Sequence, residues 1–180
     1  MSGERIGFIG VGAMGEPMCR NLVRKHDGPV TCYDLDRTPL ERLAADGARV
    51  ASSLADLADG SDIVFLSLPA GREVRSVCLG DGGLVERLAA GRTVVDASTV
   101  PPALARELAG AFGRRGINFA DAPVARTREA AIDGTLSVMV GGDGALLERL
   151  RPLLGHIASD VTHCGPVGSG QAVKILNNMI

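Results

Sequence analysis

Three glycines at fixed spacing separate an apolar run from a helical pattern near the start of the chain. The run Arg5–Ile9 precedes them, the helical pattern Ala13–Lys25 follows, and the segment itself reads Gly10-Val11-Gly12-Ala13-Met14-Gly15. The first glycine permits a tight turn, the second lets the backbone approach a pyrophosphate, and the third lets helix and strand pack closely. The exposed N–H groups and positive dipole end of the helix then favour phosphate. The segment predicts a strand, a turn and a helix that bind a dinucleotide.

The same glycine spacing is compatible with two arrangements that bind no dinucleotide. One is a tight turn that needs the glycines for its backbone conformation and binds no ligand. The second is a methyltransferase, which would likewise use a glycine-rich loop after its first strand, usually with tighter glycine spacing.

Short β-branched runs alternate with helical patterns along the whole chain. The expected strands are Arg5–Ile9, Val30–Tyr33, Arg49–Ala51, Ile63–Ser67, Thr93–Asp96, Asn118–Ala122, Ser137–Val140 and Ala158–His163. The expected helices include Ala13–Lys25, Pro39–Ala45, Glu73–Cys78, Pro101–Arg115 and Ala145–Leu154. Runs that are apolar on both faces are typical of parallel strands covered by helices on both sides. The alternation predicts an α/β fold of Rossmann type, with a doubly wound, mainly parallel sheet.

The last fifteen residues differ from this pattern. Glycines and a proline interrupt the chain over Gly165–Gly170, and Gln171–Ile180 then begins a helix that lacks a closing glycine or a basic last turn. The residues Thr99 to Pro102 indicate the N-cap region of another helix, because proline suits a first turn. We therefore divide the chain into a domain over 1–165 and the start of a further helix over 166–180, and we expect that helix either to continue or to be covered by another chain.

Charge and composition exclude several classes of function. The net charge is −2 and aromatic residues make up 3% of the chain, with no Trp, so nothing predicts nucleic-acid binding. The longest uncharged apolar stretch, Ile6–Gly15, is too short to cross a membrane. The N-terminus has no signal-peptide pattern, and the scattered cysteines Cys19, Cys32, Cys78 and Cys164 indicate buried thiols rather than disulfides. We expect a cytoplasmic protein without a metal site, since its three histidines are also scattered.

An acidic residue stands at the end of the second expected strand. Asp34 follows the glycine segment by about 20 residues, the spacing at which a carboxylate binds the ribose hydroxyls of NAD. A 2′-phosphate there would be repelled by about 4 kcal/mol per charge pair before screening. NAD is therefore the expected cofactor and NADP the less favoured one. Arg37 lies in the same loop and is a competing candidate for a 2′-phosphate, although the charge of Asp36 opposes it.

Several further motifs occur in order along the chain. They are Gly15-Glu16-Pro17-Met18, Asn21-Leu22, Leu68-Pro69, Val74-Arg75-Ser76-Val77, Gly80-Asp81-Gly82-Gly83-Leu84, Asp96-Ala97-Ser98-Thr99, Asp121-Ala122-Pro123-Val124, Gly134-Thr135-Leu136 and the segment Gly168 to Asn178. Together they resemble the β-hydroxyacid dehydrogenases, the group of 3-hydroxyisobutyrate dehydrogenase. The resemblance extends over essentially the whole chain.

This resemblance implies roles for individual residues. It implies Lys174 as the general acid or base, with Ser98 and Asn178 as the other catalytic residues. Asn178 would share a helix face with Lys174 and would also bind the substrate. Leu68, Pro69 and Thr99 would join the glycine segment and Asp34 in binding the cofactor. Surface positions for Lys174 and Asn178, and an N-cap role for Ser98, are the alternatives.

One departure from the family pattern concerns the substrate. Where the family usually has Ser-Gly-Gly after Asp-Ala-Pro-Val, this chain has Ala125-Arg126-Thr127. The planar guanidinium of Arg126 suits a carboxylate, sulfonate or phosphate, with Thr127 as a possible hydroxyl donor. A similar Arg-Thr pair resembles the sulfolactaldehyde reductases of the same family. The alternative is that Arg126 pairs with Glu129 or Asp133 on a helix surface.

A second departure is length. Family members continue into an all-α domain that closes the active site and builds a dimer, so the resemblance implies that this domain follows residue 180 and that the full-length form is a homo-oligomer. We expect a small anionic substrate. The resemblance implies that the lid and part of the substrate pocket lie outside these 180 residues, which counts against turnover by them alone. Imine reductases share the fold but generally lack the lysine, and a non-catalytic dinucleotide-binding module would not need Ser98, Lys174 and Asn178 together.

Overall fold

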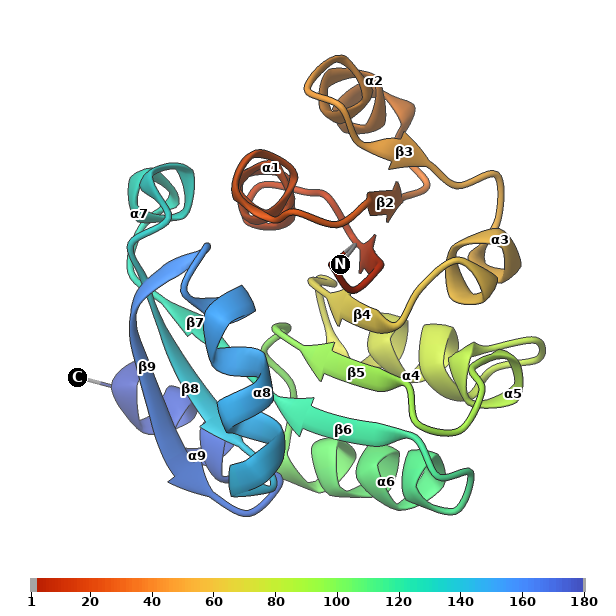
Figure 1. The fold of residues 1–180 in the computed structure, drawn as a ribbon. Coiled ribbons are helices and arrows are strands. Elements are labelled where there is room, and N and C mark those ends of the chain that lie inside the picture. Colours follow the sequence, from red (N-terminus) through yellow and green to blue (C-terminus); the bar gives the residue numbers. More distant parts are fainter. Residues whose placement is uncertain (1–2, 180) are drawn as a thin grey trace.

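One mixed sheet organises residues 3–179, the part of the chain that the computed structural model describes. Its strands are β1 (Ile6–Ile9), β2 (Val30–Tyr33), β3 (Arg49–Val50), β4 (Ile63–Leu66), β5 (Thr93–Asp96), β6 (Asn118–Asp121), β7 (Val124–Ala125), β8 (Leu136–Gly141) and β9 (Ala158–Gly165). Their order is β3-β2-β1-β4-β5-β6-β8-β7, and β9 pairs with β8 (Figure 1).

The strand β1 lies between β2 and β4 and is parallel to both. The chain first extends the sheet on one side of β1, through β2 and β3, and then continues on the other side with β4, β5 and β6. Only β8 runs against its neighbours β6 and β7, while β9 is parallel to β8. The predicted Rossmann-type, mainly parallel sheet is thereby confirmed. Its change of direction at β1 creates a crevice at the carboxyl ends of β1 and β4.

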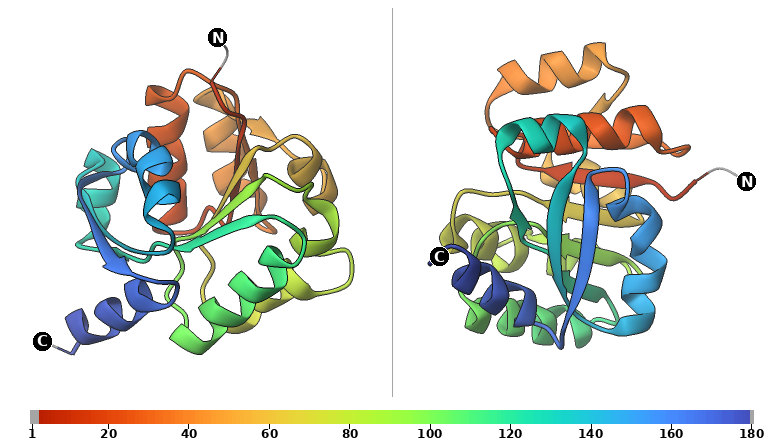
Figure 2. Two further views of the ribbon diagram at one scale, coloured as in Figure 1. Left: turned by 60° about the horizontal axis from the view of Figure 1, so that its bottom comes forward. Right: turned by 90° about the vertical axis from the view of Figure 1, so that its left-hand side faces the viewer.

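Helices cover both faces of the sheet, as Figures 1 and 2 show. They are α1 (Gly15–Lys25), α2 (Arg37–Ala45), α3 (Leu54–Asp59), α4 (Gly71–Leu79), α5 (Leu84–Arg87), α6 (Pro102–Gly113), α7 (Arg128–Asp133), α8 (Gly144–Leu154) and α9 (Ser169–Asn177). All of β4 is buried because alternate side chains enter two separate cores: Ile63 and Phe65 pack with α1 and α8, Val64 and Leu66 with α4 and α6. Burial on both faces explains why this strand is continuously apolar.

The sequence-based prediction missed four short elements, namely α3, α5, α7 and β7. Three of them are helices of six residues or fewer, too short for an apolar period to be recognised. Side-chain caps begin two of them, at Ser53 for α3 and Thr127 for α7. The longer elements were placed correctly, with ends that differ from the predicted ones by one or two residues.

Two expectations about helix ends need correction. The helix α6 begins after Pro101, which provides no side-chain cap, so the cap is not at Thr99 or Ser98. The last helix begins at Ser169 rather than Gln171, and Asn178 is its C-terminal flanking residue. Of the predicted ranges, residues 1, 2 and 180 lie outside the described part of the chain.

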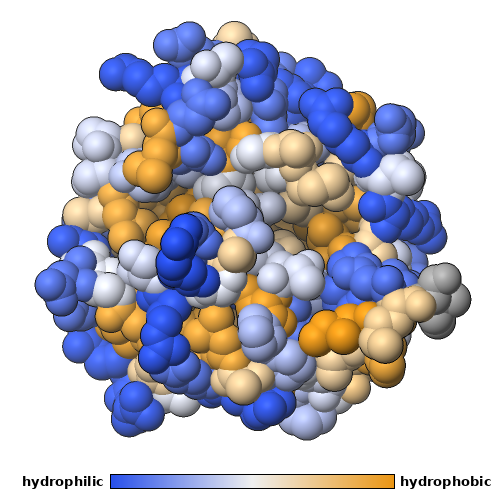
Figure 3. Space-filling view, turned by 180° about the vertical axis from the view of Figure 1, so that it is seen from behind, coloured by the Kyte–Doolittle hydropathy of each residue, from blue (hydrophilic) through white to orange (hydrophobic). Residues whose placement is uncertain are grey.

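The helix α9 packs against β8, β9 and α6 at one end of the molecule (Figure 2). Ile175, Leu176 and Met179 are between 40% and 77% exposed, and the space-filling view shows apolar surface at this end of the molecule (Figure 3). None of the helices in residues 3–179 has the length and apolar character to cross a membrane. The four cysteines are free thiols, of which Cys164 is half-buried and the others are buried.

Candidate functional site

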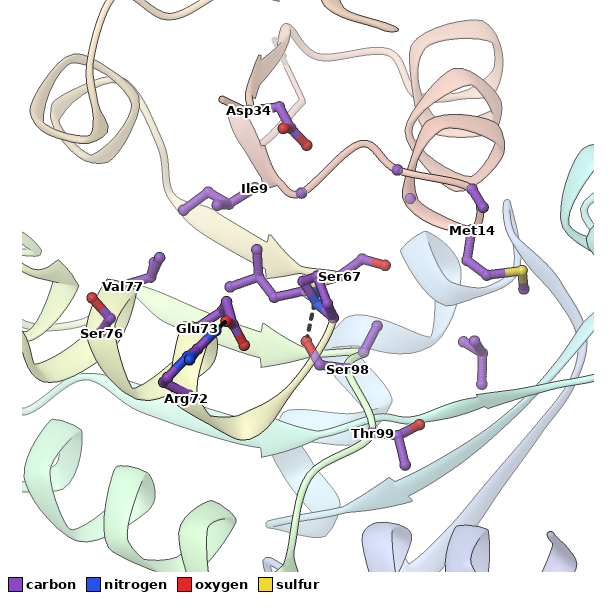
Figure 4. A pocket seen from close by; sticks show the side chains of 18 of the residues that line it. Ile9, Met14, Asp34, Ser67, Arg72, Glu73, Ser76, Val77, Ser98 and Thr99 are labelled. Carbon is purple, nitrogen blue, oxygen red and sulfur yellow. Dashed lines mark hydrogen bonds and ion pairs between the residues drawn. The ribbon is translucent and has the colours of Figure 1, made fainter. Parts of the chain in front are cut away.

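A cavity of about 1210 Å³ lies at the carboxyl ends of β1, β4 and β5, at the point where the strand order reverses. Figure 4 shows Asp34 at one end of this cavity and Ser98 with Thr99 toward the other. The predicted site residues that line it are Gly10, Gly12, Ala13, Met14, Gly15, Asp34, Leu68, Pro69, Ser98, Thr99, Arg126, Lys174 and Asn178. The fold thus brings residues from near both ends of the sequence, such as Gly10 and Asn178, into one cavity.

The glycine segment forms the turn between β1 and α1 in closely packed surroundings. Gly10 has φ +87°, and a Cβ on it would lie 2.3 Å from the carbonyl oxygen of Ser67. A Cβ on Gly15 would lie 1.9 Å from the carbonyl oxygen of Gly10, so neither position accepts a larger residue. Gly12 has open space within 4 Å of its Cβ position, and α1 begins without a side-chain cap. This open backbone at a helix N-terminus fits the pyrophosphate of a dinucleotide.

Asp34 is oriented by the backbone on both of its oxygens. Its Oδ2 accepts a hydrogen bond from the N–H of Val11 at 2.7 Å, and its Oδ1 accepts one from the N–H of Asp36 at 2.9 Å. Val11 is itself buried and contributes this bond rather than cavity surface. The competing candidate Arg37 is exposed at the first residue of α2 and does not line the cavity.

Ion pairs around the buried carboxylate of Glu16 connect α1 to α2 beside the turn. The Glu16 carboxylate accepts hydrogen bonds from Arg20 and Arg42 at distances of 2.6–2.8 Å. Hydrogen bonds from Arg42 and Arg20 lower the pKa of Glu16 to about 2 despite its burial. Because Glu16 stays ionised, it holds α1 against the segment that follows Asp34.

The loops after β4 and β5 are joined through Ser98, which is 4% exposed. Its Oγ accepts a hydrogen bond from the N–H of Leu68 at 2.9 Å, shown as a dashed line in Figure 4. A serine hydroxyl that accepts one bond still carries its own hydrogen and can donate it to a ligand. Thr99 is exposed next to it on the cavity wall.

Asp96 lies directly beneath this loop and is completely buried. Its Oδ1 accepts a hydrogen bond from the N–H of Ser98 at 3.0 Å, whereas its buried Oδ2 has no hydrogen-bond partner within residues 3–179. Burial is the main cause that raises the pKa of Asp96 to about 7, and the charge of Asp121 also raises it. Asp96 therefore changes its protonation state near neutral pH in the folded protein.

Lys174 and Asn178 both reach the cavity from one face of α9, as their spacing predicts. Lys174 is partly buried, and this burial lowers its pKa from the usual value. Asn178 is exposed at the end of the helix.

Besides Asn178, three residues are predicted to bind the substrate, and the structure divides them into two groups. Arg126 lines the cavity with φ +87°, the one positive φ outside glycine among the described residues. Its Nη1 donates to the carbonyl oxygen of Thr135 at 2.7 Å and to Ser159 Oγ at 3.1 Å, so the alternative pairing with Glu129 or Asp133 is wrong. Ala125 is buried and Thr127 caps α7, and neither lines the cavity.

Sequence reasoning missed part of the cavity wall. The additional lining residues include Tyr33, Leu35, Leu54, Arg72, Glu73, Ser76, Val77 and Asp81. Leu35 is apolar, lines the cavity and is 90% exposed. Its place directly after Asp34 was the available signal. Leu54 belongs to the unpredicted α3, so no sequence signal pointed to it.

Comparison with known proteins gives a consistent result. Residues 5–165 match the family described as the NAD binding domain of 6-phosphogluconate dehydrogenase. The chain is 40% identical over 176 residues to the 2-(hydroxymethyl)glutarate dehydrogenase of Eubacterium barkeri, covering 98% of this chain and 58% of that protein. It is 40% identical over 177 residues to the NAD-dependent L-serine dehydrogenase of Pseudomonas aeruginosa, covering 98% and 59%. The chain therefore spans about three-fifths of the length of these relatives.

A solved structure extends this similarity to three dimensions. The 3-hydroxyisobutyrate dehydrogenase of Mycobacterium tuberculosis with L-serine superposes with a TM-score of 0.91 at 36% identity. The match covers 99% of this chain and 60% of that one.

Replacing Asp96 tests its protonation near neutral pH. The folded state keeps a proton between pH 3.8 and about 7 that the unfolded chain has lost, so this carboxyl makes the protein less stable as pH rises through that window. Asp96→Asn changes the free energy of unfolding by some amount at each pH. We expect that change to favour the folded state by about 1–3 kcal/mol more at pH 8 than at pH 5. Urea unfolding at both pH values measures this difference. The same change at exposed Asp133 serves as control, and an equal effect of Asp96→Asn at both pH values would contradict the assignment.

Proposed function

This chain belongs to the family of the NAD-binding domain of 6-phosphogluconate dehydrogenase, and on that premise we propose that it forms the cofactor-binding part of an NAD-dependent dehydrogenase. The proposed substrate is a small β-hydroxy acid of the 3-hydroxyisobutyrate type, or the matching aldehyde in the reverse direction. One observation carries the proposal: the glycine turn and Asp34 share a cavity with Ser98, Lys174 and Asn178. We assign residues 1–165 to the NAD-binding domain and 166–180 to the helix that leads to a further, all-α domain.

The residues at the cofactor end of the cavity fit a dinucleotide. The turn Gly10–Gly15 and the N-terminus of α1 would hold the pyrophosphate, and the oriented carboxylate of Asp34 would accept hydrogen bonds from a ribose. Leu68, Pro69 and Thr99 would line the other half of the groove. The nicotinamide, when bound, supplies the hydride acceptor or donor.

Lys174 is proposed to move the proton of the substrate oxygen. Its ammonium would donate a proton to that oxygen during carbonyl reduction, and its neutral amine would take it back during oxidation. Partial burial lowers the pKa of Lys174 and so makes release of its proton easier near neutral pH. Asn178 would bind the substrate carboxylate or hydroxyl one turn further along α9, and the Ser98 hydroxyl would donate to the substrate, since Leu68 occupies only one of its lone pairs.

Arg126 supports an alternative substrate class. Its guanidinium is fixed to Thr135 and Ser159 through one nitrogen while the side chain lines the cavity. A preorganised guanidinium favours a second or tetrahedral anionic group, such as the sulfonate of a sulfolactaldehyde. A non-catalytic dinucleotide-binding module is the remaining alternative, and it predicts that Lys174 has no chemical role.

Cofactor preference tests the role of Asp34. We expect this chain to bind NADH more tightly than NADPH, because a 2′-phosphate would meet the carboxylate. Asp34→Ser should reduce that preference by about tenfold or more by removing the repulsion. Titration followed by nicotinamide fluorescence measures both affinities. Asp36→Ser is a matched control, since serine can still cap α2. Tighter binding of NADPH by the unaltered chain would contradict the proposal.

The two lysines of the chain allow a direct test of catalysis. In the protein that contains this chain, Lys174→Ala should lower kcat for oxidation of 3-hydroxyisobutyrate by about 10²- to 10⁴-fold while NADH binding is retained. Lys25→Ala is the matched control, because Lys25 lies outside the cavity and donates to the carbonyl oxygen of His156. Stopped-flow or steady-state rates of NADH formation provide the measurement. An unchanged kcat in Lys174→Ala would remove Lys174 from the chemistry, whereas absence of turnover by the unaltered protein would favour the non-catalytic module.

Arg126 separates the two substrate classes. If it binds a sulfonate, Arg126→Ala should raise KM for a sulfonate-bearing aldehyde by about 10- to 100-fold through loss of a charged hydrogen bond, with a much smaller effect for 3-hydroxyisobutyrate. Arg128→Ala provides a control at an exposed neighbour outside the cavity lining. Unchanged KM values for every anionic substrate tested would remove Arg126 from the substrate site.

A further inference from the structure

The single glutamine of the chain is completely buried between α9 and the loop after β5. Its Nε2 donates a hydrogen bond to the carbonyl oxygen of Ser98 at 2.8 Å, and its Oε1 accepts one from the N–H of Val100 at 3.0 Å. Gln171 therefore binds both ends of the segment Ser98–Val100 with one planar group. Because all of these groups are buried, water is not available to replace either bond.

The segment that Gln171 holds is part of the cavity wall. Ser98 and Thr99 face the cavity, and Ser98 also accepts the hydrogen bond from Leu68. Lys174 lies three residues after Gln171 on the same helix. One amide thus fixes the distance between the helix that carries the lysine and the loop that carries the serine.

Gln171 is itself fixed to the sheet by its backbone. The buried carboxylate of Asp121, at the end of β6, accepts hydrogen bonds from the N–H of Gly168 at 2.7 Å and from the N–H of Gln171 at 2.9 Å. Gly170 packs so closely on β8 that a Cβ there would lie 2.3 Å from the carbonyl oxygen of Met139. These contacts fix the first turn of α9 on the sheet. The side-chain amide of Gln171 therefore bridges a fixed distance to the Ser98–Val100 segment.

The chemistry of the two bonds requires an amide at this position. One partner is a carbonyl that needs a donor, and the other is an N–H that needs an acceptor. An ionised carboxylate at this position would accept the hydrogen bond from the N–H of Val100. The carbonyl oxygen of Ser98 would repel it, because both groups are acceptors. Methionine would fill the volume and leave both backbone groups without partners.

We propose that Gln171 is a positioning residue that sets the Ser98–Val100 segment against α9 and so shapes the nicotinamide end of the cavity. The proposal rests on the function proposed above. Asp34 lies at the opposite end of the cavity, where the adenosine ribose of NAD would bind, whereas both side-chain hydrogen bonds of Gln171 within residues 3–179 go to the Ser98–Val100 segment. Loss of the amide should therefore weaken recognition of the nicotinamide half of the cofactor and leave the ADP-ribose half unaffected.

The test compares NADH with ADP-ribose, which lacks the nicotinamide ring. Dissociation constants for both are measured by calorimetry on this chain and on Gln171→Met. We expect the affinity for NADH to fall by about tenfold, as for the loss of a buried hydrogen-bonded contact, while the affinity for ADP-ribose changes by less than about twofold. Equal weakening of both ligands, or unchanged NADH binding by the folded variant, would overturn the proposal.

Asn21 offers a matched control for general destabilisation. Its amide is 6% exposed and donates to the carbonyl oxygens of Pro17, Ala131 and Ile132, away from the cavity lining. Asn21→Leu and Gln171→Met should both lower Tm, but only Gln171→Met should change the ratio of the two dissociation constants. A change of that ratio in Asn21→Leu as well would count against a specific role for Gln171.

Gln171→Glu keeps the proposal testable if Gln171→Met does not fold. A protonated carboxyl has one donor and one acceptor, as the amide has, and an ionised one has acceptors only. Preference for NADH over ADP-ribose should therefore recover in Gln171→Glu as pH falls from 8 to 6, whereas a constant defect would contradict the proposal. The unaltered chain, measured at the same pH values, is the control for Asp96 and Asp121, the buried carboxyls nearest these bonds.

Failure of the inference and failure of the proposed function are distinguishable. Absence of NADH binding by the unaltered chain would overturn both. NADH binding that Gln171→Met leaves unchanged would overturn the positioning role alone.

Discussion

The candidate site depends on the close packing of the turn after β1 between α1 and the end of β4. Gly10 takes a positive φ against the carbonyl of Ser67, and Gly15 lies against the carbonyl of Gly10. These contacts leave no space for a side chain, so the first turn of α1 is brought to the sheet edge with its N–H groups uncapped. The same turn directs the N–H of Val11 at Asp34, which links the anion-binding helix end to the acid at the end of β2.

Two kinds of polar contact complete the site at its two ends. At the Asp34 end, backbone N–H groups or arginines donate to the carboxyl oxygens, as Asp34 and Glu16 show. The other end uses a neutral amide, Gln171, and buried carboxyls whose pKa burial raises, Asp96 and Asp121. Burial thus favours the neutral form of these two carboxyls near the loop that carries Ser98.

Most of the fold and part of the site could be predicted from the sequence, for identifiable reasons. Continuous apolar runs such as Ile63–Leu66 and the glycine spacing report local geometry, which sequence pattern encodes directly. The roles of Gln171 and Thr127 could not be predicted, because each depends on which backbone groups happen to lie nearby in the folded chain. Arg126 was singled out by its type, but its partners Thr135 and Ser159 come from segments whose pairing only the sheet determines.

The hydrogen bonds at the two ends of the cavity close loops of very different length. Val11 and Asp34 are 23 residues apart, whereas Gln171 and Ser98 are 73 residues apart. Ordering a longer loop costs more chain entropy, and contacts between distant segments form late in folding. The bond at the Asp34 end therefore joins neighbouring parts of the chain, but the bond at the Ser98 end requires α9, the last element of the described chain. The chain-entropy cost of closing the cavity is thus unequal at its two ends, smaller at the Asp34 end and larger where α9 meets the loop after β5.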